Sequence, residues 1–342
     1  MKKTPLLLLA LALLAGSFAA SAQNVVDKQG RRQGHWVRLD KDGSVIFSGN
    51  FVDGLEVDTF TYYYHDGTVR MRNVYRVPGE VCSNEAYDEQ GRLMARGSYN
   101  KRNRDGLWEF FTPDGRLIKE ARYSMGVKEG MHVVFNANGD TAEVTTWHNN
   151  HRHGRWWKRL GAKAYITATY ANGGIEGRLT EFDDAGLLVH EALYEGGLRH
   201  GTARRYDAAG VTVEESWHHG YMTDRSVRIN GDLVSIHNMV CLAPQGKART
   251  VVVLRSGEKI VCTDNTETVY DRIGDANFAM ANHKGRVLVS MACVQGLGKD
   301  SEGRDIMLLE PQPDFPIFPD EDGLRMARSA QYQADPPLGK LR

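Results

Sequence analysis

One glycine recurs along the first two-thirds of this 342-residue chain at intervals close to 24 residues. The steps between successive members are 24, 24, 24, 24, 22, 25, 24 and 21 residues. A fixed period of this length is typical of repeat proteins, in which each unit buries its apolar face against its neighbours. The period therefore predicts an array of similar units, with one glycine each at Gly43, Gly67, Gly91, Gly115, Gly139, Gly161, Gly186, Gly210 and Gly231.

The residues around these glycines indicate what each unit is. Five of the nine follow Asp or Asn, as in Asp42-Gly43 and Asn138-Gly139. These dipeptides supply the positive φ angles of a type I′ turn, so each unit is predicted to be a β-hairpin. A second set of turn signals separates the hairpins, at Asp53-Gly54, Pro78-Gly79, Asp105-Gly106, Glu129-Gly130, Asn172-Gly173, Gly196-Gly197 and His219-Gly220. The chain has 36 glycines and 10 prolines, which agrees with many tight turns in an antiparallel meander.

Aromatic residues keep the same register. One set lies four residues before the repeat glycine, and a second set, including Phe51 and Tyr99, lies eight residues after it. We expect the first set to be a structural aromatic ladder that interdigitates with the second, formed by Tyr63, Tyr87, Phe111, Phe135, Phe182 and Tyr206. Both ends of such an array need a cap, and the aliphatic residues Leu39 and Val227 take the ladder position in the terminal repeats.

The segment from Asp105 to Gly115, Asp-Gly-Leu-Trp-Glu-Phe-Phe-Thr-Pro-Asp-Gly, resembles the bacterial MORN-variant repeat found in YwqK-like antitoxins. The resemblance extends over residues 30–231 and implies a β-hairpin array and a toxin-neutralising function. The third repeat departs from the pattern, because Asn84-Glu85-Ala86 replaces Gly-x-aromatic and Cys82 lies nearby.

The N-terminus has the three parts of a secretory signal peptide. Lys2 and Lys3 precede an apolar run, which is followed by the A-x-A site Ala20-Ser21-Ala22. The run is too short to span a membrane, so we expect cleavage after Ala22 and export to the periplasm or cell surface. We expect three regions: a cleavable signal peptide over 1–22, a MORN-like β-hairpin repeat array over 23–232, and a small α+β domain over 233–342. No later segment is apolar enough to be a transmembrane helix.

The last hundred residues lack the period. We expect a hairpin from Thr250–Leu254 and Ile260–Cys262, a helix within 266–283, strands at 285–291 and 305–309, and a helix over 321–332. The run Lys284-Gly-Arg-Val-Leu-Val-Ser-Met291, followed by Asp322-Gly-Leu-Arg-Met-Ala327, resembles the TonB C-terminal domain. That resemblance implies peptide binding by strand addition. The predicted fold is thus mainly β: an elongated antiparallel meander of about nine 24-residue hairpins, then a small α+β domain.

The four cysteines, Cys82, Cys241, Cys262 and Cys293, leave their redox state open. An exported chain permits disulfides, and four cysteines allow three full pairings between which sequence does not choose. A bridge between Cys241 and Cys262 and buried free thiols are both compatible with the pattern. No two cysteines have zinc-site spacing.

Motifs of catalysis are not found. The sequence has no G-x-S-x-G elbow, no H-E-x-x-H pair and no P-loop, so we expect a non-enzyme without cofactors. The best metal candidates are histidines in turns, for which solvated side chains and no metal are the expectation. These are His148, His151, His153, His200, His218 and His219.

The sequence leaves binding as the main hypothesis. With 43 Lys+Arg against 43 Asp+Glu there is no charge excess toward nucleic acid. We expect an exported, non-catalytic scaffold of the cell envelope that binds a protein or peptide. Toxin neutralisation, a glycan- or lipid-binding surface, and a hydrolase site in the C-terminal region are the alternatives. The expected interaction surface is Trp36, Trp108, Arg155, Trp156 and Trp157.

Overall fold

The computed structural model describes residues 24–274, 278–283, 285–321, 323–325, 327 and 328. The expected signal peptide, residues 1–22, lies outside the described residues. The chain is mainly β, and 20 strands of the described part belong to one long antiparallel sheet. The fold class predicted from the repeats, an antiparallel meander followed by a smaller region that contains its own sheet, is confirmed. The chain divides into two compact units, residues 1–151 and 152–342.

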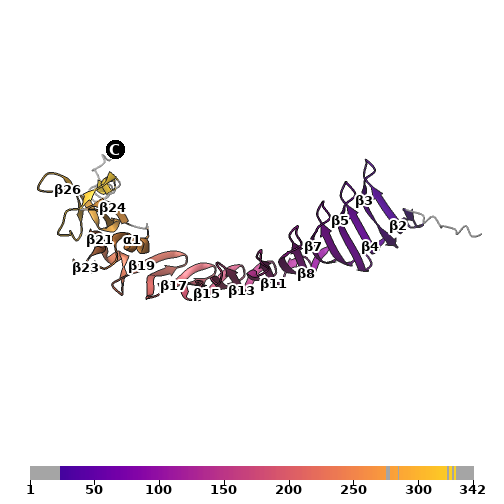
Figure 1. Cartoon of the computed structure of the whole chain (residues 1–342), viewed down its shortest axis with the longest axis horizontal. Helices are drawn as coiled ribbons and strands as arrows, with labels where there is room; N and C mark the ends of the chain where they lie inside the picture. Colours follow the sequence, from indigo (N-terminus) through magenta and orange to yellow (C-terminus); the bar gives the residue numbers. More distant parts are fainter. Residues whose placement is uncertain (1–23, 275–277, 284, 322, 326, 329–342) are drawn as a thin grey trace, which may run out of the picture. The chain divides into compact units, whose positions relative to one another are not determined.

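In the first unit the hairpins follow one another in chain order (Figure 1). From β1 to β9 each strand pairs antiparallel with the next one along the chain, β9 pairs with both β10 and β11, and β11 pairs with β12. The strands are β1 (Val25–Val26), β2 (Arg32–Leu39), β3 (Val45–Val52), β4 (Leu55–Tyr63), β5 (Val69–Val77), β6 (Val81–Tyr87), β7 (Leu93–Asn100), β8 (Asn103–Phe111), β9 (Leu117–Ser124), β10 (Val127–Lys128), β11 (Gly130–Phe135) and β12 (Thr141–His148).

The meander pattern is the same in the second unit, where consecutive strands again pair antiparallel. Its strands are β13 (His151–Arg159), β14 (Tyr165–Ala171), β15 (Gly174–Phe182), β16 (Leu188–Glu195), β17 (Leu198–Asp207), β18 (Gly210–His218), β19 (Tyr221–Ile229) and β20 (Asp232–Ser235).

The two kinds of turn differ from the expectation. At the first repeat glycine, Gly43 has φ of 90° and its N–H donates to the Asp40 carbonyl over 3.1 Å, while Lys41 and Asp42 do not have positive φ. With a register shift between Arg38 and Leu39, this is a type I turn closed by a left-handed glycine and a bulge. The prediction of type I′ turns at these glycines is therefore wrong for most of them.

The type I′ turns lie at the other end of the hairpins. Asp53 and Gly54 both have positive φ, 51° and 84°, as the two central residues of this turn require. Asn230 and Gly231 (51° and 102°) are the repeat-glycine pair for which the type I′ prediction holds. At the bulged turn of the third repeat the first residue is an aspartate that stabilises the type I geometry: the Asp88 carboxylate accepts the backbone N–H groups two and four residues later, at 3.0 and 2.9 Å.

The bulges explain a correction to the aromatic ladder. The six predicted ladder residues are half-buried, and most lie at the bulge itself; they are Tyr63, Tyr87, Phe111, Phe135, Phe182 and Tyr206. The fully buried rings stand three residues earlier, at Phe60 and Trp108, each 1% exposed. Because neighbouring residues of a strand point to opposite faces, positions three apart lie on different faces of the sheet. The buried ladder is therefore the set seven residues before the repeat glycine.

A small residue lies beneath each buried ring. The Trp108 ring covers Gly97, eleven residues earlier on the preceding strand, and Phe60 covers Gly49 in the same way. A Cβ at Gly97 would lie 2.3 Å from the Trp108 ring, and one at Gly49 would lie 2.4 Å from the Phe60 ring. The rings at the second predicted register pack beside this ladder: the Tyr99 and Trp108 ring centroids are 5.0 Å apart at 71°. Thus the second aromatic set interdigitates as expected, although with a different partner set.

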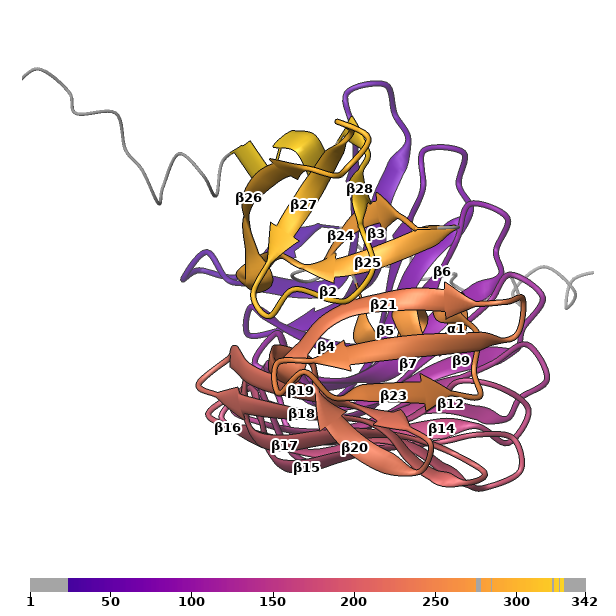
Figure 2. The ribbon, with the colours of Figure 1, turned by 90° about the vertical axis from the view of Figure 1, so that its left-hand side faces the viewer.

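The C-terminal region has its own six-stranded sheet, ordered β23-β22-β21-β25-β24-β28, and a separate β26–β27 hairpin (Figure 2). Its elements are η1 (Ile236–Asn238), β21 (Met239–Gln245), β22 (Arg249–Leu254), β23 (Lys259–Cys262), α1 (Thr266–Ile273), β24 (Phe278–Asn282), β25 (Arg286–Ser290), η2 (Met291–Cys293), β26 (Val294–Lys299), β27 (Asp305–Leu309) and β28 (Phe318–Pro319). The predicted hairpin of β22 and β23 and the strands β25 and β27 are confirmed.

Two helix predictions need comment. Only the first half of 266–283 is helical, because α1 ends at Ile273, Gly274 follows with φ of 75°, and β24 begins at Phe278. The predicted helix over 321–332 lies partly outside the described residues; Glu321, 323–325, 327 and 328 are helical.

The sheet of the C-terminal region has a core on each face, since β25 alternates between them: Val287 and Val289 belong to one core and Leu288 to the other. The second core also contains Val213, Val227 and Ile229 from β18 and β19. Val227 is 0% exposed, so the C-terminal region covers this end of the repeats, as a cap should. Leu39, at the other terminal position, is 54% exposed, so none of the residues that the structure describes covers it in this way.

A buried charge network ties the last repeats to α1. The Glu215 carboxylate, 7% exposed, accepts from Arg225 Nε at 3.0 Å and from Trp217 Nε1 at 3.0 Å. A further nitrogen of Arg225 donates to the Ile273 carbonyl at the C-terminal end of α1. One guanidinium thus joins β18, β19 and α1.

Candidate functional site

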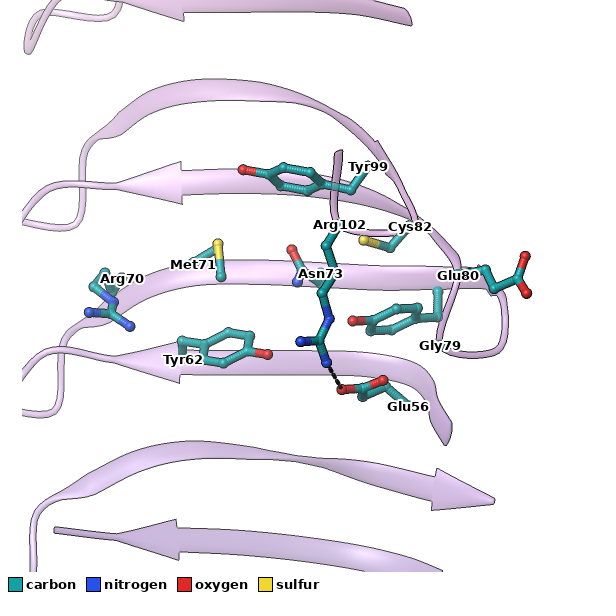
Figure 3. A pocket seen from close by; sticks show the side chains of 11 residues that line it. Glu56, Tyr62, Arg70, Met71, Asn73, Gly79, Glu80, Cys82, Tyr99 and Arg102 are labelled. Atoms are coloured by element: carbon teal, nitrogen blue, oxygen red, sulfur yellow. Dashed lines mark ion pairs between the residues drawn. The ribbon is translucent and has the colours of Figure 1, made fainter. Parts of the chain in front are cut away.

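A pocket opens in the first unit at the repeat that departs from the pattern. It has a volume of about 380 Å³, within the range of ligand pockets. Its lining comes from β4 to β7 and the turns beside them (Figure 3), and consists of Glu56, Tyr62, Arg70, Met71, Asn73, Tyr75, Gly79, Glu80, Cys82, Tyr99 and Arg102. We call it the tyrosine pocket.

The pocket lies where a ladder ring is missing. In the next repeat Trp108 covers Gly97, but here the corresponding residues are Asn84 and Asn73. Asn84 Nδ2 donates to Asn73 Oδ1 over 2.7 Å, and both side chains are buried, 2% and 7% exposed. Two short amides bonded to each other replace one large ring, and the space of the ring stays open beside Asn73, which lines the pocket.

The walls are tyrosine rings that remain neutral. Burial, assisted by the negative charge of Glu56, raises the pKa of Tyr62 and of Tyr75 above the ordinary value. The Tyr75 ring packs edge-on against Phe60, with centroids 6.0 Å apart at 86°. These rings present apolar faces and un-ionised hydroxyl groups, which suit an apolar or aromatic group with a polar end.

One ion pair lies at the rim. Arg102 and Glu56 approach to 3.8 Å, and the Arg102 side chain is 90% exposed while that of Glu56 is 20% exposed (Figure 3). Arg102 comes from the type I′ turn between β7 and β8, where it has φ of 66°. A pair this exposed contributes little to stability, so the arginine can turn toward a ligand at small cost.

The one thiol of the tyrosine pocket is buried. Cys82 is 3% exposed, and burial raises the pKa of its thiol above the ordinary value. A buried, protonated thiol is a poor nucleophile, and no histidine is among the described residues that line the pocket to activate it.

The expected interaction surface is not one surface. Trp108 is 1% exposed and belongs to the buried ladder, so its place in that set is corrected. Trp156 and Trp157 are half-buried neighbours on β13 and point to opposite faces of the sheet, while Arg155 is exposed. Trp36, in the other unit, is half-buried and donates from Nε1 to the carbonyls of Val25 and Gln33, 3.2 Å each.

The four cysteines are buried and free. Cys241 and Cys262 belong to the cores on opposite faces of the C-terminal sheet, which excludes the bridge between them. Burial raises the pKa of Cys241 to about 12.

The six candidate histidines separate into groups. His148 bonds Glu129, with Nδ1 2.9 Å from the carboxylate. His200, His218 and His219 come together in the second unit.

Strand addition, implied for the C-terminal region, meets an obstacle at one edge of its sheet. Asn230 lies against β23, where its Nδ2 donates to the Val261 carbonyl at 2.8 Å and its Oδ1 accepts from Thr263 N–H at 3.2 Å. These outward backbone groups are already paired, so an added strand would have to displace Asn230.

The departure of the third repeat is the sequence signal for the tyrosine pocket. The predicted ladder position in this repeat is Tyr87, whereas the position that carries the buried ring in the neighbouring repeats falls on Asn84. Seven residues before the repeat glycine, the first five repeats have Trp36, Phe60, Asn84, Trp108 and His132, so Asn84 is the one without a ring among them; the later repeats have Gly154, Leu179, Ala203 and Asp224.

No protein-family model matches the chain, and no curated protein matches its sequence. Among the described residues, no helix has both the length and the apolar character that membrane crossing requires.

Proposed function

We propose that this chain is an exported, non-catalytic repeat protein of the cell envelope that binds a protein or peptide, and that the tyrosine pocket receives one side chain of that partner. The observation that carries the proposal is the gap in the buried ladder at Asn84, between Phe60 and Trp108, which leaves a pocket with tyrosine walls.

The composition of the lining supports a peptide partner. Tyrosine, methionine and arginine are enriched where proteins contact one another, and a few such residues around a central pocket carry most of the binding energy. The tyrosine pocket has Tyr62, Tyr75 and Tyr99 as walls, with Met71 at the floor and arginine at the rim. An aromatic or aliphatic side chain fits these walls, and Arg102 can bond a backbone carbonyl or a carboxylate beside it.

The repeats beside the pocket support an extended partner. Equivalent side chains recur along such a sheet at fixed intervals, and repeat proteins commonly use this regularity to bind long segments. Nucleic acid would need a strongly basic surface and a polycation a strongly acidic one. The balanced charge of the chain supports neither.

The test fills the pocket without changing any of its tyrosine walls. In the variant Asn73→Gly with Asn84→Trp, the third repeat takes the ring and the glycine of the fourth, so that a tryptophan occupies the pocket. Residues 23–342 are used to select from a random peptide library displayed on phage. We expect enriched peptides to share one aromatic or aliphatic position and to lose at least about tenfold in affinity for the filled variant.

The matched control is His132→Trp, which adds a tryptophan at the ladder position of a repeat that has no such pocket. Peptides should bind this control as they bind the unchanged chain. Equal binding to the filled variant, or enriched peptides without a shared anchor, would refute the role of the pocket. Binding to an oligosaccharide array in place of peptides would favour the glycan alternative.

Toxin neutralisation, the function implied by the repeat resemblance, is one form of the same protein binding. If the chain neutralises a toxin, co-expressing the chain with that toxin should relieve its toxicity. The filled variant should not relieve it. Export itself is tested by fractionating cells that express the full chain or residues 23–342; only the full chain should leave the cytoplasm.

A further inference from the structure

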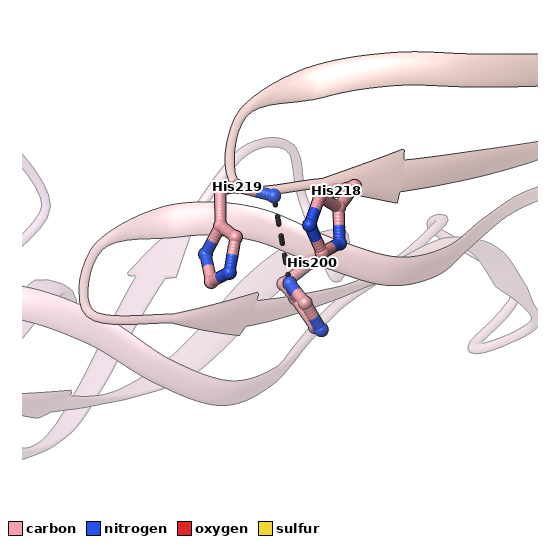
Figure 4. Close-up of side chains that lie close together, drawn as sticks. All are labelled: His200, His218 and His219. Atoms are coloured by element: carbon pink, nitrogen blue, oxygen red, sulfur yellow. Dashed lines mark hydrogen bonds between the residues drawn. The ribbon is translucent and has the colours of Figure 1, made fainter.

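Three histidines converge at the end of two neighbouring hairpins in the second unit. His200 is near the start of β17, His218 is the last residue of β18, and His219 begins the turn to β19. One ring nitrogen from each lies within 4.8 Å of one from each of the other two. Their ring centroids are 5.2 Å (His200 to His218), 4.7 Å (His200 to His219) and 4.5 Å (His218 to His219) apart (Figure 4).

The backbone explains why two consecutive histidines face the same partner. Neighbouring residues of a strand point to opposite faces, which would separate His218 from His219. His219 instead has φ of 45°, the left-handed conformation of the first central residue in this type I′ turn. The turn is held against β17 because Gly220 N–H donates to the Arg199 carbonyl over 2.8 Å. The positions of the three Cα atoms are thus fixed by main-chain bonds, while the rings can still rotate.

We propose that His200, His218 and His219 bind one divalent transition-metal ion of the zinc class. Imidazole nitrogen is a preferred ligand of Zn²⁺, Cu²⁺ and Ni²⁺, and three protein ligands with one open position form a common zinc site. A tetrahedral ion with bonds of about 2.0–2.1 Å needs its nitrogens roughly 3.3 Å apart. His218 and His219 are exposed and His200 is half-buried, so side-chain rotation alone can close the remaining distance.

The surroundings of the three rings favour a cation. The Glu195 carboxylate, at the end of β16, lies 3.6 Å from His200 Nδ1. His200 Nδ1 accepts the backbone N–H of His219 over 3.5 Å, which leaves Nε2 as the nitrogen that can bind the ion. The Glu195 carboxylate adds negative charge beside the ion and can take the open coordination position. The nearest arginine in sequence, Arg199, pairs with Glu215 at 3.5 Å and stacks on Trp217 at 4.8 Å, and alternation along β17 places it on the other face from His200.

This site departs from the expectation that the turn histidines are only solvated. The sequence placed His200 and His219 nineteen residues apart in two different hairpins, and only the paired strands bring them together. The proposal is independent of the tyrosine pocket, which lies in the other unit of the chain.

The experiment uses residues 23–342, purified without a histidine tag. Titration with ZnCl₂ in a calorimeter should give one ion per chain, and Co²⁺ should give the intense visible absorption of a tetrahedral complex. His200→Ala should weaken Zn²⁺ binding at least about tenfold, and His219→Asn should do the same. His219→Asn keeps the turn, because Asn149 and Asn172 occupy the same turn position with φ of 50° and 49°.

The matched control is His148→Ala, which removes an exposed histidine at a turn in the other unit and should leave the affinity unchanged. Far-UV circular dichroism of every variant reports whether the sheet is intact. Zn²⁺ binding that is absent, or that is as tight in His200→Ala as in the unchanged chain, would overturn the three-histidine site. The second result would assign the ion to the His218–His219 pair alone.

Discussion

Replacing Gly97 by alanine adds a single methyl group, yet it should destabilise the fourth repeat strongly. A Cβ at this position would lie 2.3, 2.5 and 2.6 Å from Cδ2, Cε2 and Cγ of Trp108. Ordinary carbon contacts are about 3.5–4.0 Å, so the ring would have to move by roughly 1 Å or more. Gly97 does not have positive φ, so backbone strain does not enter the argument.

The Trp108 ring has nowhere to move without losing contacts. Tyr99 packs edge-on against it at 5.0 Å, the Arg104 guanidinium lies 4.7 Å from its centroid, and Nε1 donates to the Ser98 carbonyl over 3.0 Å. Overpacking of this kind costs about 1–3 kcal/mol. A buried donor left unpaired costs about 1–3 kcal/mol more, while replacing a strand glycine by alanine returns about 0.5–1 kcal/mol. These ranges sum to a net loss of about 1–5 kcal/mol, and we expect a value near their middle, about 3 kcal/mol.

The assay is equilibrium urea unfolding followed by far-UV circular dichroism, with hydrogen exchange of the β7 and β8 amides as a local measure, because repeat arrays need not unfold in one step. The double variant Gly97→Ala with Trp108→Leu supplies the control. It reproduces a pair that the chain already contains, Ala168 and Leu179, at the same separation of eleven residues. In the Trp108→Leu background the alanine should cost less than about 0.5 kcal/mol. An equal cost in both backgrounds would refute the ring-over-glycine explanation.

Three further predictions concern other buried positions. Burial lowers the pKa of His132 in the ladder, so below about pH 6.5 the unfolded chain binds more protons than the folded chain and the free energy of unfolding should fall. The urea midpoint should decline less between pH 8 and pH 5 for His132→Phe than for the unchanged chain. Glu215→Ala should cost about 3–5 kcal/mol by leaving the Arg225 guanidinium buried without its carboxylate, and adding Arg225→Leu should recover most of that loss in thermal unfolding. Val227→Asp should cost several kcal/mol, whereas Leu39→Asp should change the unfolding free energy by less than about 0.5 kcal/mol; similar losses for the two would contradict the one-sided cap.

Much of the repeat architecture followed from spacing alone. The recurring glycine and the turn dipeptides fixed the hairpins, because turn chemistry is local and needs no knowledge of the neighbours. The face of the sheet that carries the buried rings did not follow. Most of the repeat-glycine turns carry a bulge, such as the one between Phe110 and Phe111 that separates Phe111 from Trp108, and a bulge has no signature in composition.

The candidate sites needed contacts between repeats, which a single sequence does not contain. Asn84 was visible as a departure, but its consequence depends on Asn73 one strand away and on Tyr99 from the strand after it. His200 and His219 were visible as turn histidines, and the pairing of β17 with β18 determines that they meet. In both cases the contact depends on the register between paired strands, which local sequence patterns do not contain.

The separation of eleven residues between each buried ring and the small residue beneath it has a consequence for how such a chain can change length. Because this separation is shorter than the 24-residue period, every ring and its seat are encoded within one period or across a single boundary. Duplication or excision of a whole period in the first unit would restore the same neighbours on both sides of the junction. An insertion between a ring and the small residue beneath it would change the eleven-residue separation and misplace the ring. The repeat-glycine turns lie outside that segment, and the steps between their glycines vary from 21 to 25 residues.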